Sequence, residues 1–302
     1  MSASLLVWIK AVRLQYYPTS FLTLFVGLSV AGFLGIIHSS VIVWMVGANL
    51  LLHCSCSLIN EYADFVSGAD LGEYPRTSWR ATGGSRVLVD KLLMPNHVLY
   101  GSFLLLGSSY VIWIWISIAL QEGLLILILT CSAGTTFLYA AAFSKGGFSY
   151  IREVILTFGA VPLFTISVVR IMSGVYSGTA LAAGLIVGMQ MMNYLLYHGL
   201  LDLQADHYSG KLRLTRFLGE EKTLCVSEIL TAGTFFVIGS LMYFEVLPLS
   251  CAVTVVLLPL AGMVIHAEVK RKPLVKTYTK VVILFVGMGV LLSLGFWLHF
   301  LI

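Results

Sequence analysis

Nine apolar runs in the chain are long enough, or nearly so, to cross the hydrocarbon core of a bilayer, which is about 30 Å thick. They are 20–37, 41–59, 99–119, 123–143, 154–170, 179–201, 225–244, 247–266 and 281–301. The strands of a membrane β-barrel would be shorter and would alternate in polarity. Charged residues make up 11% of the chain, against about 25% in a soluble domain. The sequence therefore predicts an all-α, polytopic membrane protein of nine transmembrane helices around a central cavity.

The lysines and arginines fall almost entirely on one side of this arrangement. Nine spans put the N-terminus and every second connection on the same side, and all but one of the 18 Lys and Arg residues lie there. Arg170 is the exception. By the positive-inside rule we expect this side, with the N-terminus, in the cytoplasm and the C-terminus outside. The formal net charge of +4 thus reflects topology and gives no reason to expect nucleic-acid binding.

The first twenty residues, MSASLLVWIKAVRLQYYPTS, are amphipathic and basic and lack a clear cleavage site. We expect them to lie along the membrane interface before the first span. The longer polar connections all lie on the cytoplasmic side, and we expect them to form cap loops over the cavity.

Two acidic stretches follow apolar runs on the cytoplasmic side. They are LINEYADFVSGAD, residues 58–70, and YHGLLDLQADHYSGK, residues 197–211. Helix positions four apart share a face, so Asn60 lies with Asp64, and His198 lies with Asp202 and Asp206. Glu61 is expected on the other face of its helix, in solvent.

Four spans separate the two stretches, so both point the same way through the membrane. We interpret residues 1–302 as one domain with a parallel pseudo-repeat, spans 1–4 and spans 5–8, plus a ninth span. Such a repeat would bring the two acidic stretches face to face across the central cavity.

Carboxylates arranged in this way repel one another and need a counter-charge. Oxygen ligands favour Mg²⁺, which also bridges to phosphates, whereas zinc is disfavoured because no His and Cys set converges. Basic residues of the same loops, Arg80, Arg86, Lys211 and Arg213, suit a diphosphate. An apolar cavity beneath them suits a hydrocarbon tail. The sequence thus predicts that a polyprenyl diphosphate binds with its head at the cytoplasmic face.

The segments NEYADFVSGAD…GGSRVLVDKLL and DLQADHYSGKLRLTRFLG resemble the two signatures of the UbiA superfamily of intramembrane prenyltransferases. The resemblance covers nearly the whole chain. Its details, including FLYAAAFSKGGFSYIREVILTFG at 137–159, are closest to the branch that prenylates 1,4-dihydroxy-2-naphthoate in menaquinone biosynthesis. We expect the protein to lie in the cell membrane of a bacterium or an archaeon.

The resemblance implies a role for each matching position. Asn60, Asp64 and Asp70 would hold one Mg²⁺ ion, and Asp202 and Asp206 a second. The residues implied in diphosphate binding are Asn60, Arg80, Arg86, Lys145, Lys211 and Arg213. Those implied in catalysis are Asp64, Tyr139, His198 and Asp202. The ring of Tyr139 would steady the developing allylic cation, and an aromatic acceptor would then attack it.

The chain departs from the family pattern at His198, where the branch often has Asn, and in KLRLTRFLG, where Arg213 is in register but the following Thr is not. These departures motivate an alternative: a terpene cyclase that ionises the same diphosphate and quenches the cation with an internal double bond. A transporter or lipid-binding protein is a third possibility. It is disfavoured because its carboxylates would lie at mid-span, whereas these cluster at the helix ends.

Overall fold

The computed structural model describes residues 5–35, 39–70, 84–141, 150–269 and 274–300. All regular elements in these ranges are helical. Nine helical segments of the described chain are long and apolar enough to span a membrane, which confirms the predicted fold class. These segments are Leu5–Phe33, Ser40–Ser67, Pro95–Ala119, Gly123–Ala140, Ile151–Ser173, Gly178–Leu201, Leu214–Tyr243, Leu249–Ala267 and Leu274–Leu298.

The elements follow one another along the chain with short breaks and changes of helix type. They are α1 (Leu5–Ala11), η1 (Leu14–Tyr16), α2 (Tyr17–Phe33), α3 (Ser39–Ser67), α4 (Pro95–Ala119), α5 (Gly123–Ala140), α6 (Ile151–Ile155), the π-helical turn η2 (Leu156–Ala160), α7 (Val161–Ser173), α8 (Gly178–Leu201), α9 (Leu203–Ser209), α10 (Leu214–Tyr243), η3 (Leu249–Leu257), α11 (Leu258–Val269) and α12 (Leu274–Leu298).

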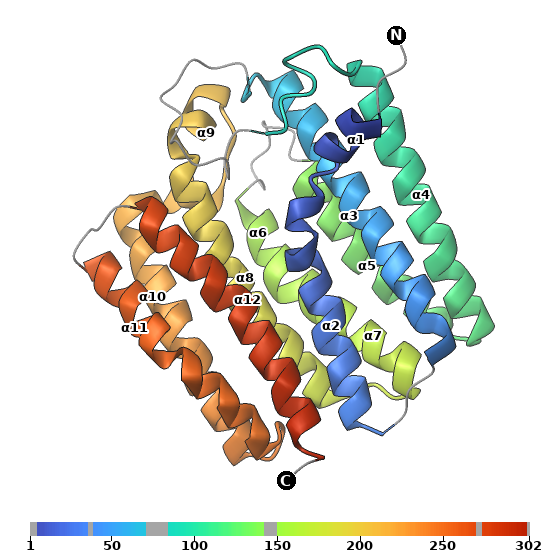
Figure 1. Ribbon diagram of the computed structural model, residues 1–302, viewed down its shortest axis with the longest axis vertical. Helices are drawn as coiled ribbons and strands as arrows, with labels where there is room; N and C mark the ends of the chain where they lie inside the picture. The colour runs from blue at the N-terminus through green and yellow to red at the C-terminus, as the bar shows by residue number, and fades with distance from the viewer. Residues whose placement is uncertain (1–4, 36–38, 71–83, 142–149, 270–273, 301–302) are drawn as a thin grey trace.

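The long helices run side by side as a bundle (Figure 1). Helices α1 and α9 lie at one end of it, and the C-terminal end of α12 lies at the other. The end that carries α1 and α9 is called the cap end below. Both acidic stretches belong to it, because α3 finishes there and α9 forms part of it.

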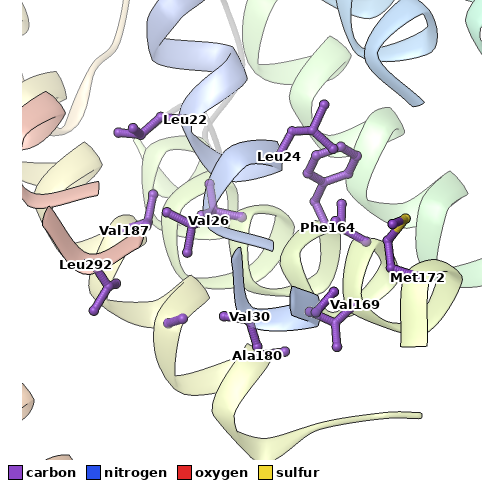
Figure 2. Close-up of a cluster of buried hydrophobic side chains, with 14 of the residues drawn as sticks. Leu22, Leu24, Val26, Val30, Phe164, Val169, Met172, Ala180, Val187 and Leu292 are labelled. Carbon is purple, nitrogen blue, oxygen red and sulfur yellow. The ribbon is translucent and has the colours of Figure 1, made fainter. Parts of the chain in front are cut away.

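The main apolar core joins α2, α7, α8 and α12, and Figure 2 shows part of it. Close approach of these helices depends on small residues, as is usual in membranes. A Cβ on Gly27 of α2 would lie 2.7 Å from Val168 Cγ1, and one on Gly188 of α8 would lie 2.0 Å from the carbonyl oxygen of Thr157. Helix α8 is therefore seated directly against the π-helical turn η2.

A buried polar seam links α8 to α10. The Gln190 side-chain amide donates to Thr234 Oγ1 at 2.8 Å, and the Asn193 amide donates to Thr231 Oγ1 at 2.9 Å. Interhelical hydrogen bonds of this kind stabilise a membrane bundle by about 0.6 kcal/mol each. The seam fixes α10 on α8, and these are the helices on either side of the second acidic stretch.

The N-terminal helix α1 packs one face against the cap end. Trp8, Ala11 and Val12 join an apolar cluster with Leu58 of α3 and Val87 of the following loop. The opposite face of α1 is exposed, and it carries the apolar side chains of Leu5, Leu6 and Ile9 as well as Lys10. The chain then turns sharply, because Arg13 adopts left-handed backbone angles, φ 51° and ψ 48°.

Candidate metal and diphosphate site

The first acidic stretch occupies about the last three turns of α3 and the turn after it. Gly68, at φ 79°, ends the helix with a left-handed residue, as glycine does without strain. The chain then folds back, so that the Asp70 N–H donates to the carbonyl oxygen of Asp64 at 3.4 Å. The Asp70 side chain is buried against Gly84, where a Cβ would meet Asp70 Oδ2 at 2.8 Å. The loop therefore brings Asp70 next to the motif.

The second acidic stretch runs from the end of α8 through α9. Arg213 bridges its two aspartates: Nη2 lies 3.2 Å from Asp202 Oδ2, and Nε lies 3.0 Å from Asp206 Oδ2. His198 Nε2 lies 3.3 Å from Asp202 Oδ2, and its Nδ1 lies 3.2 Å from the Tyr278 hydroxyl. Asp202 and Asp206 thus do face the same side, as their spacing predicts, and His198 joins Asp202 to α12.

The two stretches meet across the bundle. Lys211 Nζ, at the end of the second stretch, donates to Asp64 Oδ1 of the first at 2.7 Å. Both side chains are largely buried, with exposed fractions of 5% for Lys211 and 15% for Asp64. This ion pair confirms that segments far apart in the sequence form one cluster at the cap end.

Glu61 corrects the sequence interpretation. We expected a solvated side chain, but Glu61 is 0% exposed. Its Oε2 pairs with the guanidinium of Arg13 and accepts the backbone N–H of Ser85 at 2.9 Å. The expectation was wrong because the face of α3 that points away from the aspartates is covered by the N-terminal segment and the loop after α3.

Arg13 belongs to the candidate site, although the sequence motifs did not point to it. Besides Glu61, its Nη1 donates to Asn60 Oδ1 at 3.2 Å, while the Asn60 amide nitrogen donates to the Ala140 carbonyl at 3.4 Å. These two contacts fix the orientation of the Asn60 amide. The available signal was a basic residue in the amphipathic N-terminal segment, and it was assigned only to topology.

The other residues predicted for the site do not contact the aspartates of the two acidic stretches in the part of the chain that the structure describes. Arg86 is half-exposed and its Nε lies 3.3 Å from Asp90 Oδ1, so the structure pairs it with a neighbour on its own loop. Tyr139, near the end of α5, packs against Leu156 and a cluster that includes Tyr194. Arg80 and Lys145 lie outside the described residues.

The electrostatics of the cap end are those of a crowded acidic site. Burial, together with the neighbouring carboxylates of Asp64 and Glu61, raises the pKa of Asp70 to about 6. Burial likewise raises the pKa of Asp206 to about 6, although the cations of Arg213 and Lys211 oppose this shift. Burial disfavours the charged form of Arg213, but the carboxylates of Asp206 and Asp202 outweigh it and raise the pKa of Arg213.

This donor set fits Mg²⁺ that shares its coordination with a phosphate. The described residues hold no group of three or more His, Cys, Asp or Glu side chains gathered as a complete metal site. Mg²⁺ does not require one, because it is usually held by one or two carboxylates and completed by water and phosphate oxygens. The oxygens of Asn60, Asp64, Asp202 and Asp206 are hard ligands of the right kind, and basic side chains contact each of them.

A model of the UbiA prenyltransferase family matches residues 20–289. The chain belongs to the UbiA prenyltransferase family. It is therefore a membrane-embedded prenyltransferase, in keeping with its nine membrane-spanning segments among the described residues. No curated protein matches the chain.

Solved structures share the fold at low sequence identity. An apo UbiA homologue from Aeropyrum pernix K1 has a TM-score of 0.67 and 14% identity over 95% of this chain and 99% of its own. A digeranylgeranylglyceryl phosphate synthase has a TM-score of 0.60 and 16% identity over 97% and 96%. A UbiA homologue from Archaeoglobus fulgidus, bound to DMAPP and Mg²⁺, has a TM-score of 0.58 and 14% identity over 95% and 99%.

Proposed function

We propose that the protein transfers a polyprenyl group from an allylic diphosphate to an aromatic quinone precursor such as 1,4-dihydroxy-2-naphthoate, with Mg²⁺ as cofactor. The observation that carries the proposal is the contact between Lys211 and Asp64, which joins the two acidic stretches into one cluster of oxygen ligands and cations. Such a cluster is suited to a metal-bridged diphosphate.

Each part of the cluster has a distinct task in this reaction. Asn60, Asp64 and Asp70 on one side and Asp202 and Asp206 on the other would hold two Mg²⁺ ions, which would supply the positive charge that a departing diphosphate needs. Lys211 and Arg213 form ion pairs with the aspartates in this structure. Once metal neutralises those carboxylates, both side chains would instead bind the phosphate oxygens. Arg86, Arg80 and Lys145 are proposed as further phosphate ligands.

The bond changes follow from an allylic leaving group. The C–O bond of the prenyl diphosphate breaks, its electron pair leaves with the diphosphate, and an aromatic carbon of the acceptor attacks the allylic cation. With a naphthoate acceptor, CO₂ leaves the attacked carbon and restores the aromatic ring. Tyr139, and Tyr194 whose ring centroid lies 5.9 Å from that of His198, offer aromatic faces near the cluster for the cation.

Two independent observations support the donor and the metal. A. fulgidus UbiA homologues have been solved with DMAPP and Mg²⁺ and with GPP and Mg²⁺. In this chain, one aspartate of each acidic stretch pairs with a nearby cation: Asp64 with Lys211 and Asp206 with Arg213. The choice of acceptor is based on the sequence segments alone.

Product analysis tests the proposal. Membranes containing the protein are given geranyl, farnesyl and geranylgeranyl diphosphates with Mg²⁺, with and without 1,4-dihydroxy-2-naphthoate, and the products are identified by mass spectrometry. A prenylated, decarboxylated naphthoquinol that is lost in Asp64→Ala and Asp202→Ala is the expected result. A cyclic hydrocarbon or alcohol formed without acceptor would establish the cyclase alternative instead, and intact diphosphate under every condition would reject both.

We also propose that the cap end faces the cytoplasm of a bacterial or archaeal cell, as the distribution of Lys and Arg indicates. Single cysteines introduced in a variant without native cysteines test this orientation. A membrane-impermeant maleimide should leave a cysteine at Asp90, on the cap end, unlabelled in intact cells and should label one at Glu245, in the loop between α10 and η3. The opposite pattern would reverse the topology.

A further inference from the structure

The buried carboxylate of Glu153 lies outside both acidic stretches, yet it contacts the segment that carries their cations. Glu153 belongs to α6 and is 3% exposed. Its Oε2 accepts the backbone N–H of Leu214 at 2.9 Å. Leu214 is the first residue of α10 and directly follows Arg213, so this hydrogen bond ends next to the guanidinium that bridges Asp202 and Asp206.

The first turn of α10 is separated from the rest of that helix by a break in the helical backbone. Gly219 has non-helical angles, φ 76° and ψ 169°, which break the helix after Leu218. The turn before the break contacts α6 and the residue that precedes it. Glu153 of α6 accepts the Leu214 N–H, and the ring of Tyr150, the N-cap residue of α6, stacks on that of Phe217 with centroids 5.0 Å apart. Its position therefore depends on these contacts and on the buried Thr215, which packs against Gly199 of α8, rather than on continuity with the rest of α10.

The same turn is tied to the loop that carries Lys211. Arg216 Nη1 donates to the carbonyl oxygens of Asp206 and Lys211, each at 3.2 Å. Residues 210–218 are thus one short unit that presents Lys211 to Asp64 and Arg213 to the aspartates of the second stretch. A shift of this unit would move both cations together.

We propose that Glu153 is a positioning residue that holds this unit through the N–H of Leu214, so that Lys211 and Arg213 lie where the diphosphate binds. The inference rests on the proposed function of the cluster and adds a residue to it. Glu153 itself does not touch the substrate. It acts at a distance by fixing a backbone amide, which is how a supporting residue keeps binding groups in a productive geometry.

The chain offers a matched pair of variants at the donor end of this hydrogen bond. Leu214→Pro removes the N–H at the first position of a helix, where proline is well tolerated, and Arg213 before it already has extended angles, φ −105° and ψ 163°. Leu214→Ala removes a comparable part of the side chain and keeps the N–H. At the acceptor end, Glu153→Gln keeps an oxygen for the hydrogen bond and Glu153→Ala does not.

Binding of magnesium pyrophosphate to the purified full-length protein, measured by calorimetry, gives the functional result. We expect Glu153→Ala and Leu214→Pro each to weaken binding by about tenfold, and Glu153→Gln and Leu214→Ala to remain within about threefold of the unmodified protein. The double variant Glu153→Ala/Leu214→Pro should be no weaker than either single one, because both remove the same contact. In turnover assays the loss should appear in KM for the prenyl diphosphate, with kcat nearly unchanged.

Several results would overturn the proposal: a double variant whose loss is the product of the single losses, a Glu153→Gln variant as damaged as Glu153→Ala, or a Leu214→Pro variant no worse than Leu214→Ala. Melting temperatures of the two single variants and the double variant, measured without ligand, test in the same way whether the two residues are coupled. If the unmodified protein binds no magnesium pyrophosphate, the proposed function fails. If the unmodified protein binds it but the melting-temperature shifts of Glu153→Ala and Leu214→Pro add up in the double variant, only the role of Glu153 is rejected. If Glu153→Ala does not fold, the two Leu214 variants provide the comparison.

Discussion

At the scale of single residues, the cap end combines side chains that spacing predicts with side chains that only packing reveals. The four-residue spacing correctly placed Asp202 and Asp206 on one side, since a helix repeats its faces in that way. It could not place Glu61 or Glu153, because which face of a helix is covered depends on segments far away in the sequence. Buried carboxylates with backbone partners leave no local sequence pattern.

The ion pair between Lys211 and Asp64 leads to a prediction about stability without metal. Lys211→Met should lower the free energy of unfolding by about 3 kcal/mol, because it leaves a mostly buried carboxylate without its cation. Asp64→Asn combined with Lys211→Met should lose less than Lys211→Met alone. Thermal unfolding in detergent without Mg²⁺ measures this, and equal losses in the single and double variants would argue against a coupled pair.

The raised pKa values of Asp70 and Asp206 predict that the stability of the folded protein depends on pH in opposite ways with and without Mg²⁺. In the folded protein both carboxyls titrate near pH 6, above their ordinary value of 3.8. The folded state therefore holds more protons between these limits, and the stability contributed by these groups falls as pH rises from about 4 through about 6. Mg²⁺ requires the ionised forms, so it should stabilise the protein at pH 7.5 and hardly at all at pH 5.

Melting temperatures at the two pH values, with and without Mg²⁺, check this expectation. Ca²⁺-free and EDTA-treated samples are the controls. An equal rise in melting temperature with Mg²⁺ at pH 5 and pH 7.5 would mean that these two carboxyls do not bind the metal.

At the scale of elements, hydropathy predicts the apolar part of a helix rather than its full length. The seventh run was expected from residue 225, but α10 begins at Leu214. The turns missing from that run contain Arg216, Glu220 and Glu221, whose charges interrupt the apolar pattern. The first span likewise includes Leu5–Ala11, where Lys10 interrupts the apolar pattern.

The seat of α8 against the π-helical turn η2 predicts an asymmetric response to added methyl groups. Gly188→Ala should destabilise the protein by about 2 kcal/mol or more, because its Cβ would lie 2.0 Å from the backbone oxygen of Thr157. Gly239→Ala in α10 meets nothing within 4 Å and should be neutral or stabilising by up to about 1 kcal/mol. Unfolding measured in the same detergent compares them, and similar effects for both would contradict the close contact.

At the scale of the whole molecule, the arrangement of the two acidic stretches is a consequence of even span counting. Four spans between them return the chain to the same side, and the bundle then brings α3 and α9 to the same end, where Lys211 meets Asp64 (Figure 1). This was predictable from the sequence. The contribution of Arg13 was not, because it depends on how α1 packs across the cap end.

The central claim is that both stretches bind one diphosphate through Mg²⁺. Calorimetric titration of the purified protein with geranyl thiodiphosphate tests it directly, in the presence of Mg²⁺ or EDTA, for the unmodified protein and for Asp64→Asn and Asp202→Asn. We predict binding only with Mg²⁺ and a loss of about a hundredfold or more in either variant, since each removes ligands from the same bound group. Binding that persists in EDTA, or that survives either substitution unchanged, would contradict a single site built from both stretches.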